Sequence, residues 1–116
     1  MSCVLRMTAT ESSAPGLVPY RLTNGIAHFQ VSDACFDDLK AQTTDAIAFL
    51  RANEEHLRRA MSRPAASGVL DFAVEWRDAM VQSNTFSPEL VREAGRLGLA
   101  LELSHYPKAE AKRAEA

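Results

Sequence analysis

The stretch from Ser67 to Pro107 decides the fold, and it reads SGVLDFAVEWRDAMVQSNTFSPELVREAGRLGLALELSHYP. Apolar and polar residues alternate over 68–76 and again over 99–106, which predicts two strands with one apolar face each. Between them, Ser87 followed by Pro88 is typical of a helix start, and Gly98 is typical of a helix end. The stretch therefore predicts a strand, a short helix and a second strand.

The composition is that of one ordinary folded domain. The chain has 116 residues, of which 47% are hydrophobic and 24% charged, and its net charge is -2. This charge provides no basic field for nucleic acid or for a membrane surface, so we expect neither as a partner. Two cysteines suit a reducing compartment better than a disulfide framework, although the pair can form one bridge.

No apolar run has the length of a signal-peptide core or of a membrane span. We therefore expect a soluble cytoplasmic protein. Arg is more frequent than Lys, and Ala is abundant. This composition suggests a GC-rich bacterial source.

The N-terminal part predicts strands. Residues 1–16 form either an edge strand, over Cys3 to Thr8, or a disordered segment. Asn24-Gly25 stands between the possible strands 17–22 and 26–31, and Asn-Gly in that position is a strong hairpin signal. Pro19 cannot donate a hydrogen bond to a ladder, so we expect the first arm of the hairpin at a sheet edge.

Helical periodicity covers residues 34–62, with Ser32 and Asp33 as the expected N-cap residues. A continuous helix of this length would measure about 40 Å, which exceeds the width of a compact domain of this size. The helix therefore either breaks near Asn53 or projects toward a partner. Residues 108–116 are charged and rich in alanine, so we expect a flexible tail.

These elements predict a single α+β (or α/β) domain over residues 17–107. We expect a two-layer sandwich, in which a mixed sheet of about three to five strands carries one long and one short helix on one face. Parallel strands buried on both faces show continuous apolar runs, whereas the two strands of the deciding stretch alternate. The second face is therefore expected to be open and polar, and to carry His28, Gln30, Asp71, Glu75, Glu102 and Ser104.

Motifs for nucleotide binding, hydrolysis and zinc binding are absent from the sequence. His28, His56 and His105 have no helical i,i+4 spacing and no accompanying cysteine pair, so we expect no metal site. We expect no cofactor either. The sequence identifies no catalytic residue, and an enzyme is the less favoured class.

Polar residues follow the expected strands at their carboxyl ends, where open α/β sheets collect ligands. The candidate ligand-binding residues there are Asp33, Arg77, Asp78, Asn84, His105 and Tyr106. The alternative interpretation is structural. Trp76 and His105 continue the apolar faces of their strands and then belong to the core, and Arg77 with Asp78 fastens a turn.

Two functions from different classes follow. The first is a non-catalytic protein-interaction domain, which binds a protein partner or forms a homodimer through the open sheet face, the long helix or both. The second is a small-molecule binder, or a minor enzyme, that uses the polar cluster at the strand ends. The basic residues within 51–63 suggest nucleic-acid binding as a third function, which the acidic net charge disfavours.

Overall fold

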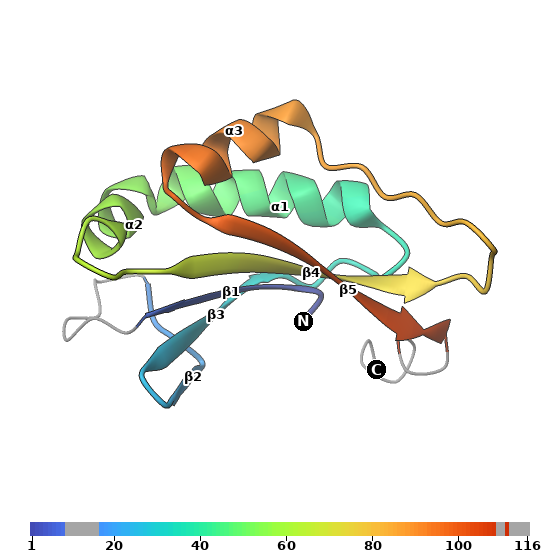
Figure 1. Ribbon diagram of the computed structural model, residues 1–116, viewed down its shortest axis with the longest axis horizontal. Coiled ribbons are helices and arrows are strands. Elements are labelled where there is room, and N and C mark those ends of the chain that lie inside the picture. The colour runs from blue at the N-terminus through green and yellow to red at the C-terminus, as the bar shows by residue number, and fades with distance from the viewer. Residues whose placement is uncertain (9–16, 109–110, 112–116) are drawn as a thin grey trace.

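The computed structural model describes residues 1–8, 17–108 and 111 of the chain (Figure 1). Its elements, in chain order, are β1 (Cys3–Thr8), β2 (Arg21–Thr23), β3 (Ile26–Ser32), α1 (Leu39–Ala52), α2 (Glu54–Met61), β4 (Gly68–Trp76), α3 (Pro88–Arg96) and β5 (Ala100–Pro107). The strands form one mixed sheet of five strands, so the predicted α+β class is confirmed.

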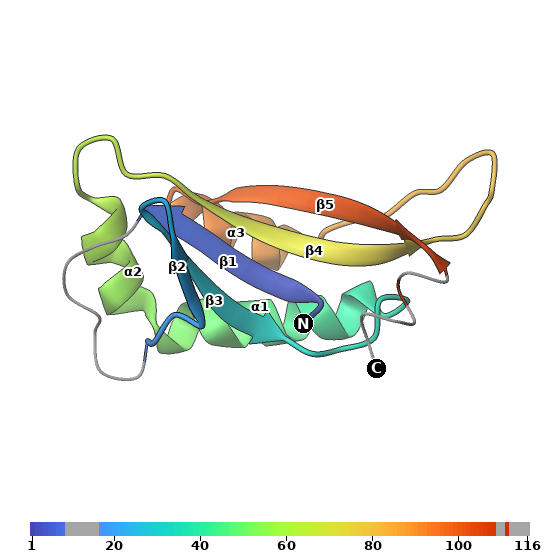
Figure 2. The same ribbon diagram turned by 90° about the horizontal axis from the view of Figure 1, so that it is seen from below.

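The strands lie in the order β2-β3-β1-β4-β5 (Figure 2). All neighbouring pairs are antiparallel except β4 and β5, which are parallel. The edge position expected for Cys3 to Thr8 is wrong, because β1 is the central strand of the sheet. Its alternate side chains Cys3, Leu5 and Met7 are buried in the hydrophobic core. The core of the domain therefore includes residues before position 17.

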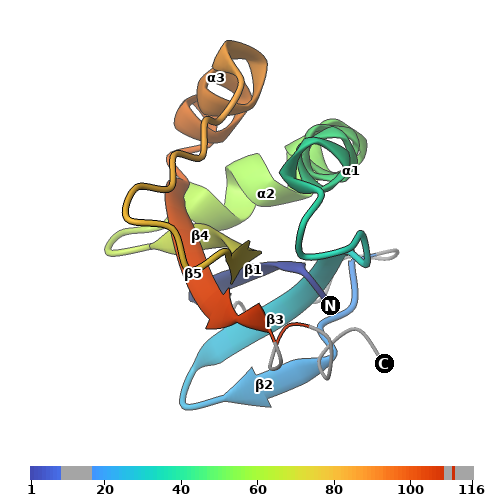
Figure 3. The same ribbon diagram turned by 90° about the vertical axis from the view of Figure 1, so that its right-hand side faces the viewer.

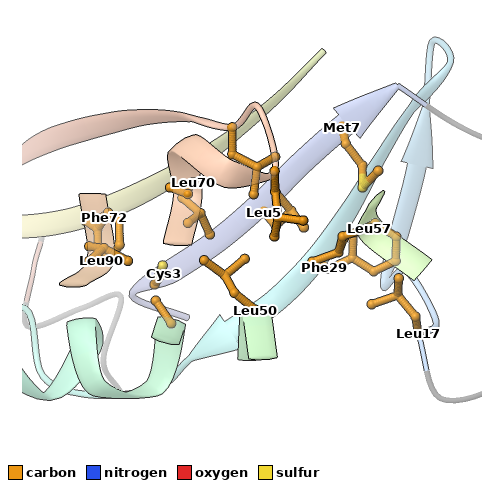
Figure 4. Packing of buried hydrophobic residues seen from close by; sticks show 14 of the residues in the cluster. Cys3, Leu5, Met7, Leu17, Phe29, Leu50, Leu57, Leu70, Phe72 and Leu90 are labelled. Atoms are coloured by element: carbon orange, nitrogen blue, oxygen red, sulfur yellow. The ribbon is translucent and has the colours of Figure 1, made fainter. Parts of the chain in front are cut away.

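The helices α1, α2 and α3 all lie on one side of the sheet (Figure 3). We call the other side of the sheet the open face. The core fills the space between the two layers, and it joins residues from both ends of the chain (Figure 4). Its largest fully buried apolar side chains are Leu5, Leu50, Leu57, Leu70, Phe72 and Leu90.

The local signals of the deciding stretch and of the hairpin are confirmed. β4 covers the residues expected for the first strand. The Ser87 hydroxyl accepts a hydrogen bond from the Leu90 N–H at 3.2 Å and caps α3. Asn24 and Gly25 have φ values of 53° and 76°, as the hairpin turn requires, and Gly98 ends α3 with φ 74°. β2 lies at the sheet edge, as Pro19 predicts.

The long helix breaks at Asn53 into α1 and α2. The Asn53 side-chain amide donates to the Phe49 carbonyl oxygen at 2.9 Å, and this local bond competes with continued helix. The expected N-cap at Ser32 and Asp33 is wrong, because Ser32 still belongs to β3 and Asp38 caps α1. The Ser32 hydroxyl bonds instead to the Asp45 carboxylate at 2.6 Å.

The C-terminal segment carries one described residue beyond 108. Ala111 is fully buried and packs with Phe36 and Ala73 in a second, smaller core cluster. The remaining residues of the expected flexible tail lie outside the described residues. Both cysteines are free: Cys3 is buried, and Cys35 is exposed.

Candidate functional site

The predicted ligand cluster lies at one end of the sheet. β3, β4 and β5 run in the same direction, so their carboxyl ends meet at that end, although β1 separates β3 from β4. The rings of Trp76 and His105 meet edge to face at 5.8 Å, and the Tyr106 ring packs at 5.4 Å from Phe36. The aromatic rings therefore contact one another, but Trp76 is 36% exposed and His105 is exposed as well, so the core position expected for these two residues is wrong: both stand at the carboxyl ends of their strands, outside the hydrophobic core.

The polar members of the cluster form separate groups. Asp33 accepts a hydrogen bond from the Gln30 side chain and lies 3.5 Å from the N-terminal ammonium group. The Arg77 N–H donates to Gln82 Oε1 at 2.9 Å, and Gln82 Nε2 donates to the Glu75 carbonyl oxygen at 3.0 Å. Asp78 has φ 55° in the same turn. Asn84, of intermediate exposure, follows in the connection to α3. Ligand binding by these residues stays a prediction.

On the β5 side of the molecule, a strand edge and a helix flank have no neighbouring element among the described residues. β5 is the last strand of the sheet and pairs only with β4 among the described strands. Its outer edge makes none of the described backbone hydrogen bonds outside the ladders. Figure 2 shows the connection 77–87 extending beyond the carboxyl ends of β4 and β5, away from the first residues of β5.

The same side of the molecule has an unoccupied flank of α3. Glu89 and Glu93 form ion pairs with Arg51 of α1, at 2.5 and 3.9 Å. At 3.6 residues per turn, Val91 and Gly95 fall on the flank of α3 opposite these glutamates, away from α1. Val91 is 49% exposed, and a Cβ at Gly95 would have no atom within 4 Å. We call this flank and the free edge of β5 the outer side.

On the open face, a polar network joins three strands. Arg6 of β1 donates to Asp71 of β4 at 2.8 Å and to Glu102 of β5 at 3.3 Å. The Ser104 hydroxyl donates to the other Asp71 oxygen at 2.7 Å. These bonds, together with the proximity of both carboxylates, raise the pKa of Arg6. The open position predicted for Asp71, Glu102 and Ser104 is confirmed.

One row of residues crosses all five strands on the open face. Register places Arg21 opposite His28, His28 opposite Arg6, Arg6 opposite Val69, and Val69 opposite Ala100. We call these five residues the transverse row. It lines a hollow of about 550 Å³ whose remaining lining residues are Met7, Thr23, Asn24, Ile26, Ser67 and Gly68.

The sequence analysis missed Arg6 and Arg21. Both are single arginines in short strands, so no motif marks them. Their neighbourhood depends on the strand order, in which β1 lies between β3 and β4. The only signal in the sequence was the alternation over 26–31, which placed His28 on the polar side.

Comparison with family models, with curated proteins and with solved structures found no match for this chain. Within the described part of the chain, histidine, cysteine, aspartate and glutamate form no group of three that suits a metal ion. None of the described helices is long and apolar enough to cross a membrane. Function has to be argued from the outer side and the open face.

Proposed function

We propose that the chain is a non-catalytic interaction domain that forms a homodimer through its outer side. The observation that carries the proposal is the free edge of β5, a strand of eight residues with no partner strand on that side among the described residues. An edge strand presents a row of unpaired N–H and C=O groups, and another strand satisfies them.

The sequence of β5 lacks the usual protection of an edge. Natural edges are blunted by lysine, by proline, by bulges or by a short strand. β5 is longer than β2, the strand at the other edge, which has only three residues. Its one proline, Pro107, is its last residue, and its ladder with β4 runs without a register shift. These features favour pairing along Ala100 to Ser104.

A second copy fits this side without opposing like charges. In an antiparallel pair, residues directly opposite each other point to the same face, so a twofold axis perpendicular to the sheet keeps both helical layers on one side. With the axis at Leu103, Glu102 lies opposite Ser104 of the second copy, and Leu101 lies opposite His105. No carboxylate then lies opposite another.

The position of α3 is compatible with the same twofold axis. The twofold axis that pairs the two β5 strands also brings the two α3 helices toward each other along the flank with Val91 and Gly95. Glycine within a helix costs about 0.5–1 kcal/mol relative to alanine, and no atom of the described residues requires it at position 95. A residue without a side chain permits close approach of a second helix.

Sedimentation equilibrium of the full chain tests the proposal. We expect a mass of about twice the monomer value of 12.7 kDa, and a monomer for Val91→Glu, because a carboxylate would be buried without a partner at the α3 contact. Val18→Glu is the matched control. Val18 is 74% exposed and lies next to β2 at the opposite edge, so this variant stays dimeric. A monomeric wild-type chain, or a dimeric Val91→Glu, contradicts the proposal.

The setting that we propose for this domain is the bacterial cytoplasm. Two free cysteines suit a reducing compartment. Burial, with the nearby charges of Asp71 and Asp45, raises the pKa of Cys3 far above the usual range, so this thiol stays protonated and unreactive. The high share of Arg and Ala supports a bacterial source.

A further inference from the structure

The transverse row places positive groups side by side at one end. Arg21, His28 and Arg6 are direct cross-strand neighbours on β2, β3 and β1. Like charges directly opposite each other destabilise a sheet. Burial, and then the charges of Arg21 and Arg6, lower the pKa of His28. Protonation of His28 between the two arginines therefore has a cost, which an anion over these residues would relieve.

Arg6 and Arg21 differ in whether their terminal guanidinium nitrogens are available to a ligand. Both terminal nitrogens of Arg6 bond to carboxylates, those of Asp71 and Glu102. Arg21 has no carboxylate within ion-pair distance among the described residues. Its Nε donates to the Thr23 hydroxyl at 3.0 Å, which orients the guanidinium and leaves its two terminal nitrogens available. This fork matches the two oxygens of a carboxylate or phosphate group.

The other end of the row is apolar. Val69 and Ala100 continue it across β4 and β5 and line the hollow there. The residues that line the hollow include no aspartate or glutamate. Strands lie about 4.8 Å apart, so the row from β2 to β5 measures about 19 Å. A volume of about 550 Å³ is within the range of small-molecule sites.

We propose that the hollow binds a small organic anion, whose carboxylate or phosphate group lies between Arg21 and His28 and whose apolar body extends along the row toward Val69. Asp71 and Glu102 lie beyond Arg6 and repel an anion there, so the anionic group is held at the β2 end. The anionic end of this site is independent of the proposed dimer, because Arg21 and His28 lie on β2 and β3 and not on the outer side.

Isothermal titration calorimetry with octanoate, octyl phosphate and 1-octanol tests the site on the full chain. We expect at least one of the two anions to bind more than tenfold tighter than the uncharged alcohol, and the better anion identifies the headgroup. Arg21→Gln should weaken that anion by at least tenfold, since a charge-assisted bidentate contact is lost. Arg92→Gln removes an exposed arginine on α3 and serves as the matched control.

Two further variants separate the parts of the site. Thr23→Val keeps the guanidinium but removes its hydrogen bond, so we expect weakening smaller than that of Arg21→Gln. Val69→Glu places a carboxylate at the apolar end and should weaken both anions. Equal binding of the anions and of 1-octanol, or unchanged anion affinity in Arg21→Gln, overturns the proposal. The oligomeric state of these variants reports separately on the dimer.

Discussion

Gln42 shows how one polar side chain fastens the helical layer to the sheet. The residue is fully buried on α1. Its Nε2 donates to the Ala73 carbonyl oxygen of β4 at 2.9 Å and to the Cys35 carbonyl oxygen at 3.2 Å. Its Oε1 has no hydrogen-bond partner among the residues that the structure describes. The two donated bonds join α1 to a buried backbone acceptor of β4 and to the loop that precedes the helix.

Replacing Gln42 by Leu should therefore destabilise the fold, although leucine is more apolar. The buried Ala73 carbonyl oxygen loses this donor, and an unsatisfied group of this kind costs about 1–3 kcal/mol, whereas the Cys35 carbonyl oxygen keeps its bond from the Asp38 N–H at 2.9 Å. Loss of the unpartnered Oε1 offsets part of this cost, so we expect a net loss of about 1–2 kcal/mol in urea unfolding. Thr44→Val is the control: it removes an exposed bond to the Lys40 carbonyl oxygen on the same helix. Equal stability of the Gln42 variant and wild type would show that these bonds contribute nothing.

At the scale of elements, two glycines near one end of α3 have opposite roles. Gly98 has φ 74°, a backbone conformation that side chains with a Cβ rarely adopt, whereas Gly95 lies within regular helix with open space around it. Gly98→Val should cost more than about 1 kcal/mol, and Gly95→Ala should gain about 0.5–1 kcal/mol in the monomer. Thermal unfolding of both variants at low concentration measures this. Similar effects of the two changes would contradict this account of the helix end.

The elements that the sequence predicted well are those with agreeing local signals. β4, α3 and the hairpin each carry alternation, a capping serine or an Asn-Gly turn within a few residues. The start of α1 was missed because Ser32 and Asp38 are both possible caps, and only tertiary contacts decide between them. Val91 is half exposed, because α3 ends the helical layer beside β5.

The candidate site was less predictable than the fold. Asp71, Glu102 and Ser104 could be placed on the open face by alternation alone. The partner that joins the two carboxylates, Arg6, comes from a segment that was expected at an edge or in disorder. Which residues share a row depends on strand order and register, and neither is encoded by spacing along the chain.

At the scale of the whole molecule, the sheet divides the surface into parts with different chemistry. The chain has extents of 42 × 29 × 23 Å, and its long dimension follows the strands and α1 (Figure 1). One face of the sheet is covered by helices, the open face carries the transverse row, and the outer side leaves β5 and a flank of α3 without a neighbour. A second copy at the outer side would extend both layers without covering the hollow near β2.

Hydrogen exchange of the β5 amides, measured by NMR at low and at high protein concentration, tests the proposed dimer most directly. Alternate N–H groups of a strand point to opposite edges, so every second amide of Ala100 to Ser104 faces away from β4. The account predicts that these outward amides exchange fast in dilute solution and become protected as concentration rises, while the inward amides change little. Outward amides that exchange equally fast at every concentration would contradict self-association through β5.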